Sequence, residues 1–388
     1  MKIAIDISQI AHHGSGVARY TYGLIRSLLK YDRKNQYVFF FSSLRQKIPQ
    51  GIKQEIKEKH ILKEFFLPTT LLEILWNKLH IIPIENFIGA VDIFISSDWV
   101  EPPAKMAKKI TVIHDLIALK YPKESHPLTE FSLKKFNISA NIVDVQKRRL
   151  NWMKKESGLI IADSYATKKD ILTFLKIPET KIEVVYPSVE ITIPNKNQIK
   201  KTMKKYQIKR PFILTVGKIE PRKNLSRLIN AFLKVKLNDI DLIIVGPQGW
   251  NVSNYELRIT NYRNIKFLGF IPDEDLYSLY KSAMFFIYPS IYEGFGYPVV
   301  EAMKMDCPVA TSNTSSLKEV ADSCCLLFNP YSEEDIANKI LLMYQNKKLR
   351  LQLKEKGKKR SEFFSPQKFA NNLIKIFEKI KKLPNLIN

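Results

Sequence analysis

The chain has 388 residues, of which 45% are hydrophobic and 11% aromatic, and its formal net charge is +24. This length suits two domains that each bury a core of their own, and the composition excludes a disordered chain. Because the three cysteines form no disulfide framework and no stretch approaches the roughly 20 apolar residues of a membrane-spanning helix, we expect a cytoplasmic protein, free or attached to the inner face of the plasma membrane.

Short apolar runs alternate with longer helical patterns in the first half of the chain. They predict strands at residues 2–7, 37–43, 91–97, 109–113 and 158–164. The first run contains a lysine and an aspartate, so we interpret it as a strand and not as a signal peptide. Runs of this kind, separated by helices, are typical of parallel strands that are buried on both faces.

A glycine turn follows the first predicted strand. Gly14 and Gly16 precede a helical pattern, and such a turn presents backbone N–H groups and the positive end of the helix dipole, which suit a phosphate group. A dinucleotide fingerprint would need a third glycine where Arg19 stands, so NAD is not expected. An ordinary strand-to-helix connection would explain the turn equally well.

Two stretches of the first half have a composition that suits an anionic membrane surface. Residues 64–83 collect leucines and aromatic residues, and residues 147–155 (KRRLNWMKK) surround Trp152 with five basic residues. Basic and apolar side chains together favour reversible contact with anionic lipids. The alternative is that the first stretch is a pair of core helices and the second a solvated helix face.

The second half repeats the alternation of apolar runs and helical patterns. It predicts strands at residues 212–217, 241–246, 265–269, 284–290, 308–312 and 324–328. A polar, lysine-rich stretch separates the halves, so we expect domains at 1–190 and 191–365, with 366–388 as a C-terminal helix that packs back on the first domain. The fold class is α/β, with two doubly wound, Rossmann-like domains. Ligands of such sheets bind outside the carboxyl ends of the strands.

Three cations follow the predicted strand at 212–217. Lys218, Arg222 and Lys223 lie directly before a helix for which Asn224 is the expected N-cap. The positive end of a helix dipole repels cations, so their position indicates that an anion with several charges binds between them and the helix. Surface lysines of a lysine-rich chain are the alternative interpretation.

A glycine-rich loop, IYEGFGY, follows the predicted strand at 284–290. Gly294 and Gly296 allow positive φ angles and a close approach of the backbone to a ligand. Pro298 fits the first position of the next helix, which puts Glu301 in the first turn, where a carboxylate is stabilising by itself. Glu293 lies beside the glycines, and we expect it to bond to neutral groups such as hydroxyls, because a bound phosphate would repel it.

The basic excess is concentrated toward the C-terminus. Residues 344–388 contain 13 basic and 3 acidic residues. An anionic partner or solvated lysine-rich helix faces would both explain this excess. Binding to nucleic acid is an alternative function, but no helix-turn-helix, RNP or zinc pattern supports it, and we expect no nucleic-acid partner.

Motifs of both halves resemble the retaining nucleotide-sugar glycosyltransferases of family 4, in particular the mannosyltransferase-like branch that builds bacterial surface polysaccharides. The likeness covers nearly the whole chain, and the EGFG core between Glu293 and Glu301 is its most specific part. The segments that carry it are GSGVARYTYGLIRSL (14–28), VIHDL (112–116), IIADSYATKKDIL (160–172), GKIEPRKNLSRLINAF (217–232), FLGFIPDEDLYSLYKSA (267–283) and YPSIYEGFGYPVVEAMKMDCPVATSNTSSLKEV (288–320).

The resemblance implies a GT-B fold, in which two Rossmann-like domains face a central cleft. In the N-terminal domain it implies that Gly14 and Gly16 close over the donor diphosphate and that His114 lies near the donor sugar. It also implies that Arg222 and Lys223 hold the diphosphate and neutralise the leaving group, with Lys218 assisting.

The resemblance further implies that Glu293 and the backbone of Gly294, Phe295 and Gly296 face the donor sugar, and that Glu301 bonds the ribose hydroxyls. Asp306 stands where the family usually has glycine, which asks an aspartate to adopt a tight turn.

The implied reaction is retaining transfer of a hexose from a nucleotide-diphosphate sugar to a saccharide acceptor. The expected acceptor is lipid-linked, and the expected donor is GDP-mannose. We expect no cofactor and no metal, because no aspartate-x-aspartate triplet lies in a suitable loop and lysine and arginine would replace the cation. A nucleotide-sugar epimerase of the same fold remains an alternative.

Overall fold

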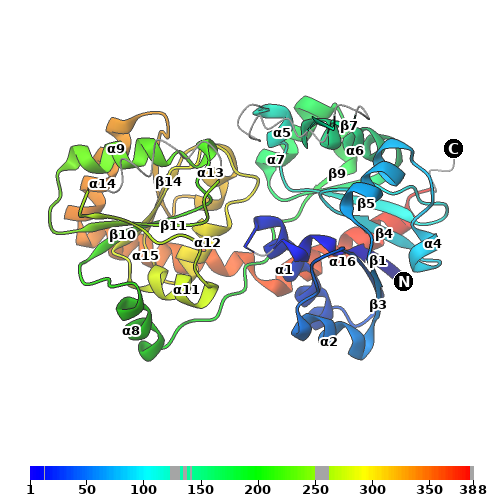
Figure 1. Cartoon of the computed structure of the whole chain (residues 1–388), viewed down its shortest axis with the longest axis horizontal. Helices are drawn as coiled ribbons and strands as arrows, with labels where there is room; N and C mark the ends of the chain where they lie inside the picture. The colour runs from blue at the N-terminus through cyan, green and yellow to red at the C-terminus, as the bar shows by residue number, and fades with distance from the viewer. Residues whose placement is uncertain (13, 123–131, 134–137, 140–141, 250–261, 385–388) are drawn as a thin grey trace. The chain divides into compact units, whose positions relative to one another are not determined.

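The computed structural model describes residues 1–12, 14–122, 132–133, 138–139, 142–249 and 262–384. The described residues form two compact units, and the chain passes from the first to the second between Ser188 and Val189 (Figure 1). The helix that begins at Pro366 belongs to the first unit, which is therefore built from both ends of the chain.

The first unit contains a seven-stranded sheet in the order β3-β2-β1-β4-β5-β8-β9, in which all neighbouring strands are parallel. Its strands are β1 (Lys2–Asp6), β2 (Gln36–Ser42), β3 (Ile61–Phe65), β4 (Ile93–Ser96), β5 (Lys108–Ile113), β8 (Ser157–Ala162) and β9 (Ile182–Val184). A separate antiparallel pair is formed by β6 (Ser132–Leu133) and β7 (Ile138–Ser139). The five predicted strands are β1, β2, β4, β5 and β8, whereas β3 and β9, at the two edges, were not predicted.

Helices and short helical turns connect these strands. They are η1 (Ser8–Ala11), α1 (Gly16–Tyr31), α2 (Gln50–Lys59), α3 (Thr69–Leu72), the π-helical η2 (Glu73–Lys78), α4 (Glu85–Ile88), α5 (Ile117–Lys120), α6 (Ile142–Glu156), α7 (Tyr165–Asp170), the π-helical η3 (Ile171–Leu175), η4 (Glu179–Lys181) and α16 (Pro366–Lys382).

The last helix, α16, completes the core of the first unit. It contacts α1, and its apolar face is buried, including Phe369, Leu373 and Phe377. The ring of Phe369 meets Tyr20 of α1 edge-on, with 5.5 Å between the ring centroids. At the other end of α16, Lys108 Nζ donates a hydrogen bond to the carbonyl of Lys381 (2.9 Å). The strongly amphipathic sequence of α16 explains why it docks on this unit.

The second unit contains a six-stranded parallel sheet in the order β12-β11-β10-β13-β14-β15. Its strands are β10 (Phe212–Val216), β11 (Asp241–Val245), β12 (Ile265–Phe267), β13 (Phe285–Tyr288), β14 (Val309–Ser312) and β15 (Leu326–Phe328), all of which were predicted. Its helices are α8 (Lys196–Lys205), η5 (Pro221–Lys223), α9 (Leu225–Val235), α11 (Asp273–Ser282), α12 (Tyr297–Lys304), α13 (Ser315–Ala321), α14 (Glu333–Gln345), α15 (Lys347–Ser361) and η6 (Glu362–Phe364).

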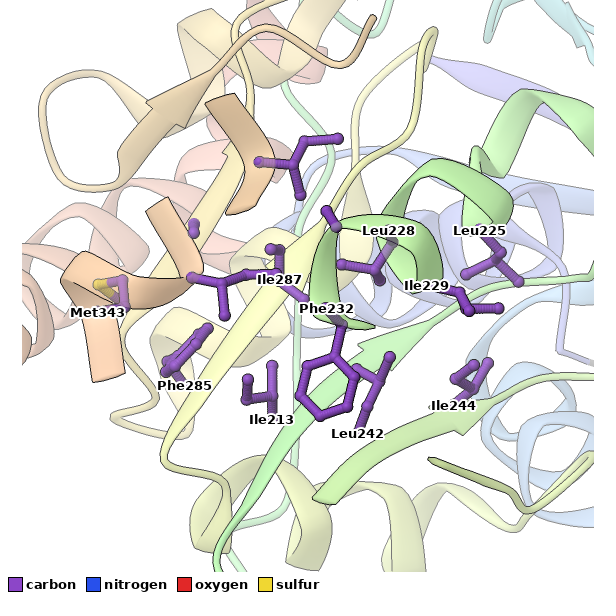
Figure 2. Close-up of a cluster of buried hydrophobic side chains, with 14 of the residues drawn as sticks. Ile213, Leu225, Leu228, Ile229, Phe232, Leu242, Ile244, Phe285, Ile287 and Met343 are labelled. Atoms are coloured by element: carbon purple, nitrogen blue, oxygen red, sulfur yellow. The ribbon is translucent and has the colours of Figure 1, made fainter. Parts of the chain in front are cut away.

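Aliphatic side chains of the strands pack against two helices in the core of the second unit (Figure 2). Phe232 of α9 and Met343 of α14 face Ile213 of β10 and Phe285 of β13 across this core. The helices α9 and α14 lie side by side on one face of the sheet (Figure 1). Burial of these side chains stabilises the sheet, and its strand order determines which loops meet at the carboxyl ends of the strands.

The structure corrects part of the prediction for residues 64–83. Trp76 and Leu72 are buried in the core, as the alternative interpretation of this stretch required. Other apolar residues of the stretch are exposed: 76% of Phe66, 54% of Leu79 and 47% of Ile81 are accessible.

The five basic residues around Trp152 do not all lie on an exposed surface. Arg149 is buried, and its guanidinium donates to the backbone carbonyl of Val112 (2.9 Å). Arg148 pairs with Glu73 (2.7 Å), and Trp152 stacks on His80. Lys154 and Lys155 are exposed. No helix in the described part of the chain is long and apolar enough to cross a bilayer.

Candidate active site

The structure brings together two of the predicted cations and one predicted carboxylate. Arg222 and Lys223 lie on the turn η5 after β10, and Glu293 lies in the loop after β13. These strands are parallel neighbours in the sheet, so the loops that follow them lie at the same edge. The neighbouring positions of β10 and β13 therefore explain how residues 70 positions apart come into contact.

The Glu293 carboxylate contacts both cations. Its Oε2 lies 2.7 Å from Arg222 Nη1, and its Oε1 lies 2.6 Å from Lys223 Nζ. The hydroxyls of Tyr288 and Ser290 donate to the same Oε1, at 2.8 and 2.6 Å. Glu293 does bond to hydroxyl groups, as predicted, but they belong to the protein, and the prediction of only neutral partners is wrong.

A second carboxylate also contacts Arg222. Glu220 Oε1 accepts hydrogen bonds from Arg222 Nη2 (2.6 Å) and Nε (3.0 Å), and the carbonyl of Tyr292 accepts another from Nη1 (2.8 Å). We refer to Arg222, Lys223, Glu220 and Glu293 as the four-charge cluster. Its two positive and two negative groups balance, so the cations are held in place without a net positive charge.

Burial and charge oppose each other within the cluster. Burial by itself raises the pKa of Glu293, but Arg222 and Lys223 outweigh it and lower this pKa to about 2. Burial, together with the neighbouring Arg222, lowers the pKa of Lys223, while Glu293 opposes the shift. Glu293 is therefore ionised at neutral pH, and the strong pairing keeps its partners oriented.

The sequence interpretation missed three members of this site. Tyr288, Ser290 and Glu220 were not singled out, although they lie within the segments YPS and IEP at the carboxyl ends of β13 and β10. The signal that could have identified these three residues was their position at the end of a strand. A tyrosine or serine is common there, however, and does not by itself indicate a site.

The loop from Glu293 to Gly296 is buried and held by the start of α13. Ser316 Oγ donates to the carbonyls of Glu293 (2.9 Å) and Phe295 (3.0 Å), and the Glu293 N–H donates to Ser315 Oγ (3.0 Å). Gly296 has a φ of 101°, and a Cβ atom there would lie 2.7 Å from Leu317 Cδ2. Glycine is therefore favoured at this position by its conformation, and any larger residue would also require the Leu317 side chain to shift.

Other predicted details of this loop need correction. Gly294 does not adopt a positive φ. The side chain of Phe295 is buried against Tyr297 and Phe364, which leaves its backbone, the part predicted to face the sugar, as the candidate for ligand contact. The helix begins at Tyr297, and Pro298 is its second residue.

Glu301 is consequently beyond the first turn of α12. It is buried, and its Oε2 accepts a hydrogen bond from Tyr280 of α11 (3.3 Å). Asn224 occupies the N-cap position of α9, but its side chain does not cap the helix. It has a φ of 57° and donates from Nδ2 to the carbonyls of Pro289 (3.1 Å) and Pro330 (2.7 Å).

Lys218 differs from the other two predicted cations in its accessibility to solvent. Its side chain is exposed, whereas those of Arg222 and Lys223 are only partly exposed. Asp306 adopts a φ of 58°, as predicted for a residue in place of glycine, and Lys281 pairs with it at 2.5 Å. This turn lies outside the four-charge cluster.

The predicted residues of the first unit lie at the carboxyl edge of its own sheet. Gly14 has a φ of 80° and precedes Ser15, whose side chain caps α1 by accepting from the N–H of Ala18 (3.1 Å). Gly16 is the first residue of α1. His114 follows β5 directly, is buried, and meets the ring of Tyr20 in α1 edge-on, with 4.6 Å between centroids.

Comparison with known proteins identifies relatives of the chain. Residues 198–360 match the family described as glycosyl transferases group 1. O-antigen chain mannosyltransferase B of Escherichia coli is 28% identical over 285 residues, which cover 71% of each chain. A Campylobacter jejuni enzyme named N-acetylgalactosamine-N,N'-diacetylbacillosaminyl-diphospho-undecaprenol 4-alpha-N-acetylgalactosaminyltransferase is 27% identical over 239 residues, 60% of this chain and 63% of that protein.

Solved structures with a similar fold include the following two proteins. Sucrose-phosphate synthase from Thermosynechococcus elongatus has a TM-score of 0.73 at 16% identity, over 98% of this chain and 99% of that one. WaaG, a glycosyltransferase involved in lipopolysaccharide biosynthesis, has a TM-score of 0.69 at 15% identity, over 99% and 100% of the two chains. These matches confirm the predicted GT-B fold class, and the family match confirms the resemblance stated from the motifs.

Proposed function

We propose, from the premise that residues 198–360 match the family described as glycosyl transferases group 1, that the protein is a retaining hexosyltransferase that uses a nucleotide-diphosphate sugar as donor. We further propose that the sugar is mannose, supplied as GDP-mannose, and that the acceptor is a saccharide carried on a lipid. The relative from Escherichia coli, an O-antigen chain mannosyltransferase, supports this choice of sugar. The undecaprenol in the name of the Campylobacter jejuni relative supports a lipid-linked acceptor.

The observation that carries the proposal is the four-charge cluster, because it holds two cations in fixed positions beside a glycine loop. Breaking the anomeric C–O bond of the donor builds negative charge on the departing phosphate. Cations that are already oriented stabilise charge that grows in the transition state, which lowers the barrier. We propose that Arg222 and Lys223 contact the diphosphate, that Lys218 assists them, and that Glu293 orients them.

The remaining predicted residues have proposed roles in donor binding. Glu301 would bond the ribose hydroxyls, and the backbone from Gly294 to Gly296 would face the sugar. Gly14 and Gly16 would contact the diphosphate, and His114 would contact the sugar. A nucleotide-sugar epimerase and a nucleic-acid-binding protein are not favoured, because the relatives are glycosyltransferases.

A panel of nucleotide sugars tests the proposed donor. We expect GDP-mannose to raise the melting temperature most, since a ligand at 100 times its Kd adds about 2.7 kcal/mol to the free energy of unfolding. We also expect mannose transfer to an extracted lipid-linked acceptor to continue in EDTA, because the proposed cations are side chains. Stabilisation by a different nucleotide sugar alone would refute the mannose assignment, and loss of transfer in EDTA with recovery in Mg²⁺ would refute metal independence.

A lipid-linked acceptor would bring the first unit to an anionic membrane surface. Phe66, Leu79 and Ile81 are exposed in the stretch that suits interfacial contact, and Lys154 and Lys155 are exposed basic residues of the same unit. We propose that these side chains contact the membrane, and that the protein acts there as a peripheral enzyme at the cytoplasmic face. Basic residues contribute about 1 kcal/mol each near such a surface.

Vesicle co-sedimentation tests this contact. We expect the protein to bind vesicles that contain anionic lipid and to dissociate at high salt. Simultaneous replacement of Phe66, Leu79 and Ile81 by serine should weaken the binding at least tenfold, whereas Leu351→Ser, which removes an exposed leucine of the second unit, should not. Absence of binding at low salt, or equal effects of the two variants, would exclude this surface.

A further inference from the structure

A histidine and an aspartate lie side by side at the carboxyl edge of the first sheet. Strands β5 and β8 are parallel neighbours, and Ile113 of β5 is paired with Ala162 of β8. The next residue on each strand is His114 and Asp163, so the sheet register places the two side chains together. His114 Nδ1 lies 2.7 Å from Asp163 Oδ2.

Three polar atoms around this pair have no hydrogen-bond partner among the described residues. They are His114 Nε2, Asp163 Oδ1 and the hydroxyl oxygen of Tyr20. All three residues are more than nine-tenths buried, with accessible fractions of 8%, 3% and 2%, and the Tyr20 ring contacts the His114 ring. Buried polar atoms without partners are costly and uncommon in proteins, so their grouping indicates a place for the oxygen atoms of a bound molecule.

Charged groups from several elements surround the histidine. Burial alone would lower the pKa of His114, but the charge and hydrogen bond of Asp163 raise it, with Asp98 adding to the rise and Arg149 opposing it. Burial raises the pKa of Asp163, and it also raises the pKa of Tyr20 well above the ordinary value. Both members of the pair are thus shifted toward retaining a proton.

We propose that Asp163 is a positioning residue that acts through His114. The carboxylate accepts a hydrogen bond from Nδ1 and thereby fixes the imidazole ring, so that Nε2 binds an oxygen of the substrate sugar. This inference rests on the proposed function as a sugar transferase and adds to it the residue that sets the orientation of His114. In its ionised form, the Asp163 carboxylate only accepts hydrogen bonds, so the ring nitrogen that faces it must carry a proton.

Histidine NMR titration of the unliganded protein tests the coupling without any assumption about the reaction. The chain has six histidines, so the signal of His114 is identified by its loss in His114→Gln. We expect its pKa to lie above the ordinary value in the wild type and to fall in Asp163→Asn, which keeps the shape of the side chain but removes the charge. An unchanged titration of His114 in Asp163→Asn would overturn the proposal.

A double-variant comparison tests the effect on transfer. We expect Asp163→Asn to lower kcat by about 10- to 100-fold, the range of a hydrogen bond to a charged group. In a His114→Ala background, Asp163→Asn should have no further effect on kcat, because the residue through which Asp163 acts is already absent. The control is Asp170→Asn, which removes another buried carboxylate of this unit, paired with Lys120 at 2.9 Å, and should leave kcat unchanged.

The outcomes separate this inference from the proposed function. Transfer that is insensitive to Asp163→Asn, or losses that multiply in the double variant, would overturn the positioning role while leaving the transferase intact. Absence of transfer from every nucleotide sugar would refute the proposed function, and in that case the NMR result still decides whether Asp163 controls the state of His114.

Discussion

Replacement of Lys223 by alanine is expected to lower kcat by about 30- to 900-fold, which corresponds to about 2–4 kcal/mol of lost transition-state stabilisation. The reason is that Lys223 Nζ, fixed by Tyr288 (2.7 Å) and Glu293 (2.6 Å), would neutralise charge that develops only as the donor bond breaks. Single-turnover rates at saturating donor measure this effect directly.

The matched control for this substitution is Lys234→Ala. Lys234 lies on the adjacent helix α9 and pairs with Glu333 at 2.8 Å, but its side chain is 59% exposed. We expect its removal to change kcat less than twofold, since surface pairs contribute little. A Lys223→Ala variant with normal kcat and only a raised KM would show that Lys223 binds the donor without assisting departure of the leaving group.

Glu293→Gln is expected to lower the free energy of unfolding at neutral pH by about 3–5 kcal/mol, because it leaves the largely enclosed side chains of Arg222 and Lys223, which are 17% and 12% exposed, without their shared counter-charge. The folded-state pKa of Glu293 is about 2, below the ordinary 4.5, so ionisation stabilises the fold. This contribution is fully present above pH 4.5 and is lost as the pH falls toward 2.

Urea unfolding at several pH values measures the effect of Glu293→Gln. The difference between wild type and variant should be largest near pH 7 and should shrink below pH 4.5. Glu333→Gln removes the carboxylate of the exposed pair with Lys234 and should cost at most about 1 kcal/mol. A Glu293→Gln variant as stable as the wild type at pH 7 would contradict the role of Glu293 in holding the cluster.

Much of the fold could be predicted from the sequence because both sheets are parallel and buried. Their inner strands are continuous apolar runs, which stand out from the helical patterns between them. The edge strands β3 and β9 were missed for the opposite reason. Their sequences, ILKEF and IEV, carry charged residues and remain partly exposed, so nothing in the pattern distinguishes them from loops.

Three charged members of the candidate site could be predicted from the sequence, but their pairing could not. Position after a strand singled out Arg222, Lys223 and Glu293, yet their direct contact depends on β10 and β13 being neighbours in the sheet. The burial of Arg149 was likewise hidden, because it depends on a carbonyl of β5 that lies far away in the sequence. Local sequence patterns predict local structure. They could not predict these contacts, because the contacts join residues that are distant in the sequence.

The return of α16 to the first unit has a consequence for the order in which the protein folds during synthesis. The ribosome makes β1 to β9 first, but the apolar faces that α16 covers stay open until residues 366–382 have been made. Phe369 of α16 also supports Tyr20, whose ring contacts His114. The strands and helices that the structure describes in the second unit all lie within residues 189–365. The half of the chain that emerges first is therefore the last to complete its core and its site.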